Sequence, residues 1–425
     1  MVRNANLLLA VGIASLWAAT GRPQDTMLNA RSEGLQKDST VFVLDSTWRI
    51  WDSLWVSWCR ESTCLSLDTG IWNIRGFDPA DVPALDEEAI TRRMAVLDAE
   101  SPLDLAWNPL VHNRIAFYSS KRKNHLGEML GRQGHYFPMF EEALDRHDIP
   151  LEIKYLPIVE SALNPVVRSR AGATGLWQFM YTTGKSMGLR VDSYIDERKD
   201  PERSTDAACR YLRKLHAMYG DWYLALAAYN AGPGNVNKAI RRSGGKESYW
   251  EIRPWLPAET RGYVPAFMAV VYLMNFHVEH NIFPIDSLPA AASVDTVHVH
   301  APMRFDQISA ELPVTQETLL RLNPMYRQSI LPGPPDHWPL RLPVELIPAF
   351  LALEERILAH EPEKTPEIVF VPEPVVYRVK SGDVLGTIAN RYGVSVKQIK
   401  EWNGLNGSMI RVGQKLYIHA NPSSL

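Results

Sequence analysis

One carboxylate stands at the end of an apolar run near the middle of the chain. Residues 155–160 read Tyr-Leu-Pro-Ile-Val-Glu, and a loop rich in glycine and amide side chains follows. Pro150 begins a short predicted helix and Asn164-Pro165 ends it, because proline cannot continue the hydrogen-bond ladder of a helix. Apolar neighbours disfavour the charged form of a carboxyl group and raise its pKa. Glu160, in the last turn of this helix, is therefore our candidate for a general acid near neutral pH.

Helical patterns lie on both sides of this segment. Between residues 108 and 148 apolar side chains recur at helical spacing, and we predict two helices joined at Gly131–Gly134. Residues 202–219 and 221–229 predict two more helices, the second of them rich in alanine. The central part of the chain is thus expected to be predominantly α-helical.

Two further motifs follow in order, Ala-Tyr-Asn-Ala-Gly-Pro-Gly at 228–234 and Glu-Thr-Arg-Gly-Tyr-Val at 259–264. Together with residues 155–180 they resemble the lytic murein transglycosylases, whose catalytic domain is related to goose-type lysozyme. The resemblance covers roughly residues 100–275, and we assign 101–285 to a mainly α-helical, lysozyme-like catalytic domain. One departure is Tyr181, where the family usually has proline, so the local loop shape is expected to differ.

The resemblance implies roles for residues at matching positions, with Glu160 as the catalytic acid. The substrate-binding residues that it implies are Ser169, Gln178, Met180, Tyr229, Asn230 and Tyr263. Each also has an ordinary structural interpretation: Ser169 as a turn residue, Met180 as core filler, and the two tyrosines as buried, hydrogen-bonded phenols. Their order and spacing around Glu160 favour a functional role, most strongly for Gln178, Asn230 and Tyr263.

The implied reaction cleaves the β-1,4 bond between N-acetylmuramic acid and N-acetylglucosamine and closes a 1,6-anhydro ring, with Glu160 acting first as acid and then as base. Ordinary glycosidases use two carboxylates, and we identify no second acid in the matching motifs. Capping and ion pairing with nearby arginines explain the next acids along the chain, Asp192, Asp196, Glu197 and Asp200. Two alternatives stay open: a hydrolytic muramidase and a non-catalytic peptidoglycan-binding scaffold protein.

Small modules follow the catalytic domain. Residues 361–374 carry repeated prolines and predict a stiff linker. Residues 376–419 predict the order strand, helix, helix, strand and resemble the peptidoglycan-binding lysin-motif (LysM) module, with Gly382, Asp383 and Asn403 as glycan-binding residues. A weaker form of the same order at 294–345 is interpreted as a degenerate LysM, or equally as a packing subdomain without a ligand. The fold class is thus multidomain, a helical catalytic domain with a small C-terminal βααβ module.

The N-terminus predicts export. Residues 1–21 combine Arg3, an apolar stretch and small residues, as in a cleavable signal peptide, and the apolar stretch is too short for a membrane span. The first cysteine is Cys59, so no lipid anchor is predicted, and peripheral membrane association stays open. Residues 22–41 are interpreted as a linker, and 42–100 have no assigned role. We expect the protein in the periplasm or cell envelope.

Charge and the spacing of histidines and cysteines limit the partners and cofactors that we expect. A net charge of −3 and a pI near 6.5 do not favour nucleic acid. His298 and His300 alternate as on a solvated strand face without a suitably spaced third ligand, so we predict no metal. Cys59 and Cys64 have the spacing of a small disulfide, whereas Cys209 is expected to be a buried thiol. We expect no cofactor, and peptidoglycan glycan strands as the partner.

Overall fold

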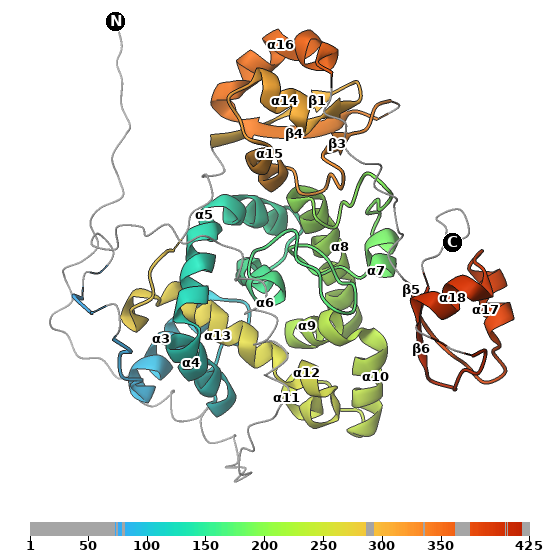
Figure 1. Cartoon of the computed structure of the whole chain (residues 1–425). Coiled ribbons are helices and arrows are strands. Elements are labelled where there is room, and N and C mark those ends of the chain that lie inside the picture. The colour runs from blue at the N-terminus through green and yellow to red at the C-terminus, as the bar shows by residue number, and fades with distance from the viewer. Residues whose placement is uncertain are drawn as a thin grey trace, which may run out of the picture. The chain divides into compact units, whose positions relative to one another are not determined.

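The structure is a computed structural model of the 425-residue chain (Figure 1). It describes residues 73, 75–78, 81–285, 293–334, 336–361, 375–403, 405 and 407–418. The predicted signal peptide, the linker at 22–41, and Cys59 and Cys64 lie outside these residues, as does nearly all of the linker at 361–374. Within the described residues, buried apolar side chains form three clusters, in residues 90–282, in residues 297–357 together with Ile195, and in residues 377–418.

The largest cluster belongs to a helical region at 87–285, in blue to yellow in Figure 1. Its α-helices are α3 (Glu87–Glu100), α4 (Pro109–Lys121), α5 (Lys123–Arg146), α6 (Leu156–Ser161), α7 (Tyr181–Ser186), α8 (Pro201–Tyr219), α9 (Trp222–Ala231), α10 (Pro233–Arg242), α11 (Tyr249–Ile252), α12 (Ala258–Arg261) and α13 (Tyr263–Asn275). Short 3-10 turns occupy Leu151–Tyr155, Arg253–Trp255 and Val278–His280. The predicted helical fold is confirmed.

Helix α13 is the centre of this region. Its residues from Tyr263 to Met274 are all buried, as expected for a helix that is apolar on every face. It packs against α4, α6 and α9, and so connects the helix that carries Glu160 to the rest of the core. Its first residue, Tyr263, enters the candidate site.

The predicted joint at Gly131–Gly134 is wrong. Helix α5 runs without a break from Lys123 to Arg146, and the break from α4 falls at Arg122, whose φ and ψ of −129° and 20° are not helical. Each glycine within a helix costs about 1 kcal/mol relative to alanine. The long buried face of α5, which includes Phe137 and Phe140, offsets that cost.

A second cluster belongs to residues 293–361. Strands β1 (Val294–Val299) and β4 (Trp338–Pro343) pair antiparallel, and α14 (Phe305–Glu311) and α15 (Gln316–Leu322) lie between them in sequence. Two additions are a short antiparallel pair, β2 (Met303–Arg304) with β3 (Ile330–Leu331), and α16 (Ile347–Ala359), which lies beyond the predicted boundary at 345. The expected order of strands and helices is present.

The third cluster belongs to the C-terminal module. Strands β5 (Val375–Arg378) and β6 (Lys415–Ile418) pair antiparallel around α17 (Leu385–Arg391) and α18 (Val396–Trp402). The predicted order strand, helix, helix, strand is confirmed. Across the whole described part of the chain, no helix has both the length and the apolar character that a membrane crossing requires.

Candidate active site

Glu160 lies in the last turn of α6, as predicted, and is 6% exposed. The hydroxyl of Tyr263, the first residue of α13, donates a hydrogen bond to Oε1 of Glu160. Burial raises the pKa of Glu160 to about 8, the hydrogen bond from Tyr263 acts in the opposite direction, and the charge of Glu259 raises it further. Glu160 therefore carries a proton at neutral pH and has a donor beside it that stabilises the carboxylate once the proton is given away.

The backbone turns sharply directly after Glu160. Helix α6 ends at Ala162, before Asn164-Pro165, because Ala162 and Leu163 have φ of 51° and 57°, in the left-handed region. Such a conformation costs about 1 kcal/mol for a residue with a Cβ atom. The buried Arg132 of α5 donates from Nη1 to the carbonyl oxygen of Ala162 at 3.1 Å and is paired with Glu128. In the sequence this pair resembles an ordinary surface i, i+4 pair, so its role was not predicted.

The α6–α7 loop (residues 162–180) carries three of the predicted binding residues. Ser169 accepts a hydrogen bond at Oγ from the backbone N–H of Ala173 at 3.1 Å, which is the turn role considered for it. Gln178 has a φ of 47°, and its Nε2 donates to the carbonyl oxygen of Gly175 at 2.8 Å. Met180 is 39% exposed, so the core-filler interpretation of this residue is wrong.

Tyr229 and Asn230 lie at the end of α9. The hydroxyl of Tyr229 donates to the carbonyl oxygen of Trp177 at 2.7 Å, which connects α9 to the α6–α7 loop. Burial raises the pKa of Tyr229 well above its usual range, and the charge of Glu160 adds to this effect, so the two side chains are neighbours. Asn230 accepts at Oδ1 from the hydroxyl of Thr260 at 2.8 Å.

Glu259 is a second acid of the site that the sequence interpretation missed. It is the first residue of the Glu-Thr-Arg-Gly-Tyr-Val motif, and the statement that the motifs hold no further acid has to be corrected. Burial raises its pKa, while a hydrogen bond with Asn230 lowers it. Because its charge also raises the pKa of Glu160, the two carboxyl groups interact. The position of Glu259 four residues before Tyr263 was the available signal.

The residues predicted to bind glycan in the C-terminal module form hydrogen bonds within that module. Asn403 donates from Nδ2 to the carbonyl oxygens of Ile399 and Tyr417, both at 2.8 Å. Asp383 accepts from the hydroxyl of Tyr377 at 2.5 Å and from the N–H of Lys380 at 2.6 Å. Gly382 has a φ of 88°, which favours glycine. An open hollow elsewhere on the module is lined by Met409, Arg411 and Gln414.

Two predictions about isolated residues are confirmed. Cys209 is fully buried in α8, and burial raises the pKa of its thiol to about 12, so it is an inert core residue. His298 is exposed on β1, as a solvated strand face requires.

Three family models match the chain. The Transglycosylase SLT domain matches residues 137–252, the Lytic transglycosylase MltD, LysM-like domain matches residues 293–359, and the LysM domain matches residues 377–419. The membrane-bound lytic murein transglycosylase D of Escherichia coli (strain K12) is 31% identical to this chain over 315 residues, which are 72% of this chain and 68% of that protein. This chain belongs to the lytic murein transglycosylase D family. The predicted enzyme class, a lytic transglycosylase, is therefore confirmed.

Other relatives match over shorter stretches. The soluble lytic murein transglycosylase of Escherichia coli (strain K12) is 35% identical over 116 residues, which are 26% of this chain and 18% of that protein. The crystal structure of the 70-kDa soluble lytic transglycosylase from Escherichia coli matches 41% of this chain and 29% of that chain, with 29% identity and a TM-score of 0.32. The stretch that matches the SLT domain, residues 137–252, includes Glu160 and the α6–α7 loop but ends before Glu259 and Tyr263.

Proposed function

We propose that this lytic transglycosylase cleaves the β-1,4 bond between N-acetylmuramic acid and N-acetylglucosamine in peptidoglycan, with Glu160 as general acid and then general base. The observation that carries the proposal is the buried Glu160 with the hydroxyl of Tyr263 hydrogen-bonded to it. A carboxylic acid with a pKa of about 8 holds its proton at neutral pH and is ready to donate it.

In the first step the proton of Glu160 moves to the glycosidic oxygen while the bond from that oxygen to C1 of the muramic sugar breaks. The leaving sugar departs with a 4-hydroxyl group, and Glu160 becomes a carboxylate. The 2-acetamido group of the substrate stabilises C1, as in substrate-assisted glycosidases. The hydrogen bond from Tyr263 favours the charged form of Glu160 at this stage.

In the second step the Glu160 carboxylate takes the proton of the 6-hydroxyl group while O6 bonds to C1. The 1,6-anhydro ring closes, Glu160 regains its proton, and no water is consumed. Gln178, Met180, Tyr229 and Asn230 are proposed to bind the sugars around Glu160, with Ser169 shaping the loop that carries Gln178. Met180 is exposed enough for such contact.

We further propose that the chain is exported to the periplasm or cell envelope and that its C-terminal LysM module binds glycan strands through the surface around Gly382 and Asp383. The module then raises the local concentration of substrate at the catalytic domain. The name of the Escherichia coli relative includes "membrane-bound", which supports a location at the cell envelope.

The test is mass spectrometry of products released from purified sacculi by the wild type, Glu160→Gln and a matched control, Glu142→Gln. Glu142 is an exposed glutamate on α5. We expect 1,6-anhydromuropeptides from the wild type and the control, and none from Glu160→Gln, which still pellets with sacculi. Retained cleavage by Glu160→Gln contradicts the assignment of the catalytic acid.

A hydrolytic reaction is the second candidate, because the carboxyl groups of Glu259 and Glu160 interact. In that mechanism Glu259 activates a water molecule, as the second carboxylate of a glycosidase does. Its products carry reducing ends. The same mass spectra therefore decide between the two reactions.

A further inference from the structure

The LysM-like domain (residues 293–359) is joined to the α7–α8 segment (residues 187–200) of the catalytic domain. Ile195 forms an antiparallel bridge with Tyr326, and the backbone hydrogen bonds Asp196 N–H to Met325 O and Arg327 N–H to Tyr194 O are both 2.9 Å long. The side chain of Ile195 is 0% exposed and belongs to the hydrophobic core of the LysM-like domain. Leu189 of the same segment belongs to the core of the catalytic domain, so the segment contributes to the cores of both domains.

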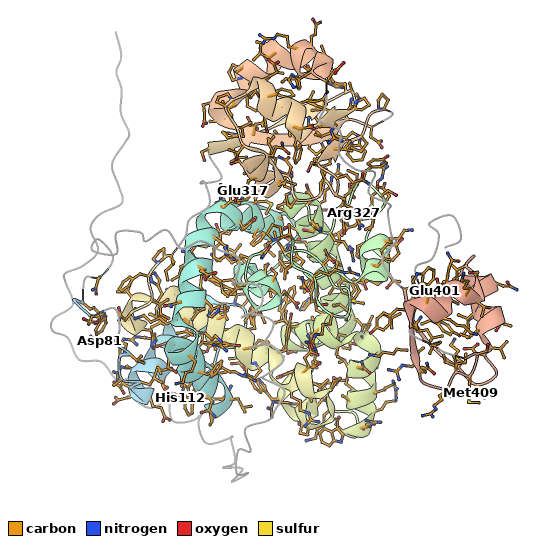
Figure 2. All side chains as sticks on the ribbon, in the orientation of Figure 1. Asp81, His112, Glu317, Arg327, Glu401 and Met409 are labelled. Carbon is orange, nitrogen blue, oxygen red and sulfur yellow. The ribbon has the colours of Figure 1, made fainter. Side chains whose placement is uncertain are left out.

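An ion-pair cluster lies directly beside this bridge. Asp196 is fully buried, and Arg198 donates to its two oxygens from Nε and Nη2, both at 2.9 Å. Arg327, which follows α15 and is labelled in Figure 2, donates from Nη2 to Oδ2 of the same carboxylate at 2.9 Å. Burial acts to raise the pKa of Asp196, but the hydrogen bond and charge of Arg198 and the charge of Arg327 hold it below its usual range. One aspartate thus connects an arginine of each domain.

The remaining donor of Arg198 reaches the α6–α7 loop. Its Nη1 donates to the carbonyl oxygens of Gly172 at 3.2 Å and Phe179 at 3.4 Å. The loop and residue 198 also touch along the backbone, because a Cβ atom on Gly175 would lie 1.8 Å from the carbonyl oxygen of Arg198. These contacts fall on both sides of Gln178 and next to Met180.

We propose that Arg327 and Asp196 are positioning residues for the transglycosylase reaction. The LysM-like domain holds Asp196 through Arg327, Asp196 orients the guanidinium of Arg198, and Arg198 fixes the loop that presents Gln178 and Met180. The LysM-like domain is then a part of the catalytic unit. This inference rests on the proposed role of the α6–α7 loop in substrate binding.

A second ion pair between the same two domains supplies a matched control. Arg341 of β4 donates from Nη1 to Oδ2 of Asp200 at 2.8 Å, and Asp200 is the N-cap of α8. Asp200 and Arg341 are both buried, as are Asp196 and Arg198, whereas Arg327 is partly exposed. The side-chain hydrogen bonds of Arg341 go to Asp200 and Glu202, so loss of this side chain leaves the contacts of Arg198 to Gly172 and Phe179 in place.

The experiment compares Arg327→Met, Arg327→Lys and Arg341→Met in the full chain, on soluble uncross-linked glycan strands. We expect kcat to fall at least tenfold in Arg327→Met, since a displacement of about 1 Å in positioned groups can cost up to ~100-fold. Arg327→Lys keeps a cation beside Asp196 and should recover part of this loss, and Arg341→Met should stay within about twofold of the wild type. Equal kcat values for Arg327→Met and Arg341→Met at matched melting temperature overturn the proposal.

Amide hydrogen exchange gives a readout that does not depend on activity. Residues 172–179 should exchange faster in Arg327→Met than in the wild type and Arg341→Met, while α13 exchanges at the same rate in all three. Unchanged exchange of the loop contradicts the proposal even if one variant is poorly active. Glu160→Gln separates this inference from the proposed function: cleavage by that variant refutes the catalytic assignment and leaves the exchange result valid.

Discussion

Glu160 and Asp196 are two carboxyl groups with nearly the same burial, 6% and 0% exposed, whose pKa values are shifted in opposite directions. Asp196 has Arg198 and Arg327 within 2.9 Å, and its pKa is lowered in spite of burial. Within residues 81–285 and the other described ranges, no Lys or Arg forms an ion pair with Glu160, and its pKa rises to about 8. The presence of cations, and not the depth of burial, decides which of these acids is charged at neutral pH.

The difference in pKa corresponds to two different roles of a buried acid, a structural one and a catalytic one. A buried carboxylate that is paired and hydrogen-bonded keeps its charge and holds backbone segments in place. A buried carboxyl group without a cation keeps a proton that it can transfer. The two regions meet in the α6–α7 loop, whose carbonyl oxygens accept from Arg198 and whose first residues follow Glu160 directly. Variants that remove a cation from Asp196, or change the groups around Glu160, test whether charge pairing determines the role of each acid.

The largest effect is expected from Arg198→Met. It leaves Asp196 buried with one cation fewer and removes the contacts to Gly172 and Phe179. Breaking a buried pair by removing one partner costs about 3–5 kcal/mol, and we expect a loss of that order in urea unfolding, together with loss of activity. The double variant Arg198→Met/Asp196→Leu should recover stability but not activity. A single variant as stable as the wild type would show that Asp196 is not charged.

The next effect concerns the pH dependence of stability. The pKa of Glu160 is about 8 in the folded chain against an ordinary value of 4.5, so between these values the folded protein retains a proton that the unfolded chain has lost. The free energy of unfolding therefore falls as pH rises, by about 3 kcal/mol up to pH 7, and the loss is complete above pH 8. Glu160→Gln has no such group and should gain stability relative to the wild type from pH 5 to pH 8. Parallel unfolding curves for the two proteins across this range would contradict the raised pKa.

Tyr263→Phe removes the hydrogen bond that favours the charged form of Glu160. A hydrogen bond to a charged group is worth about 1.5–3 kcal/mol, so we expect kcat to fall by roughly 10- to 100-fold and the alkaline limb of the pH–rate profile to move to higher pH. The shift of the profile distinguishes this role from packing, since a packing defect lowers kcat without moving the pKa. Tyr272→Phe, on the same helix and away from Glu160, is the control.

Several of these features were readable in the sequence and several were not. The position of Glu160 followed from proline and apolar neighbours, and the resemblance of three motifs indicated Tyr263 and Asn230. Ion pairing of Asp196 and Asp200 with nearby arginines was predicted. The pairs of Asp196 with Arg327 and of Asp200 with Arg341 were not, because these arginines lie more than a hundred residues away. The unbroken α5 was missed since burial overrides the low helix propensity of glycine, which local sequence does not show.

The two LysM-type regions illustrate the same limit. Asn323 donates to the carbonyl oxygens of Leu319 and Arg341, and Asn403 donates to those of Ile399 and Tyr417, so each connects a helix end to the last strand in the same way. Each asparagine directly follows the second helix of its region. The two strand residues whose carbonyl oxygens accept from these asparagines have different surroundings. Arg341 forms an ion pair with Asp200, whereas Tyr417 is 40% exposed. Only the three-dimensional structure shows that one region is attached to the catalytic domain.

The smallest effect is expected from Glu259→Gln, which removes a negative charge near Glu160 without changing Glu160 itself. The charge of Glu259 raises the pKa of Glu160, so its removal should lower that pKa and move the alkaline limb of the pH–rate profile to lower pH, by less than about one unit because Glu259 is only partly buried. The direction is opposite to that of Tyr263→Phe, and the products should remain 1,6-anhydro forms. If Glu259→Gln instead abolishes cleavage and the wild type releases reducing ends, Glu259 is the second catalytic carboxylate. In that case the raised pKa of Glu160 comes from a working acid–base pair rather than from isolation of one acid from cations.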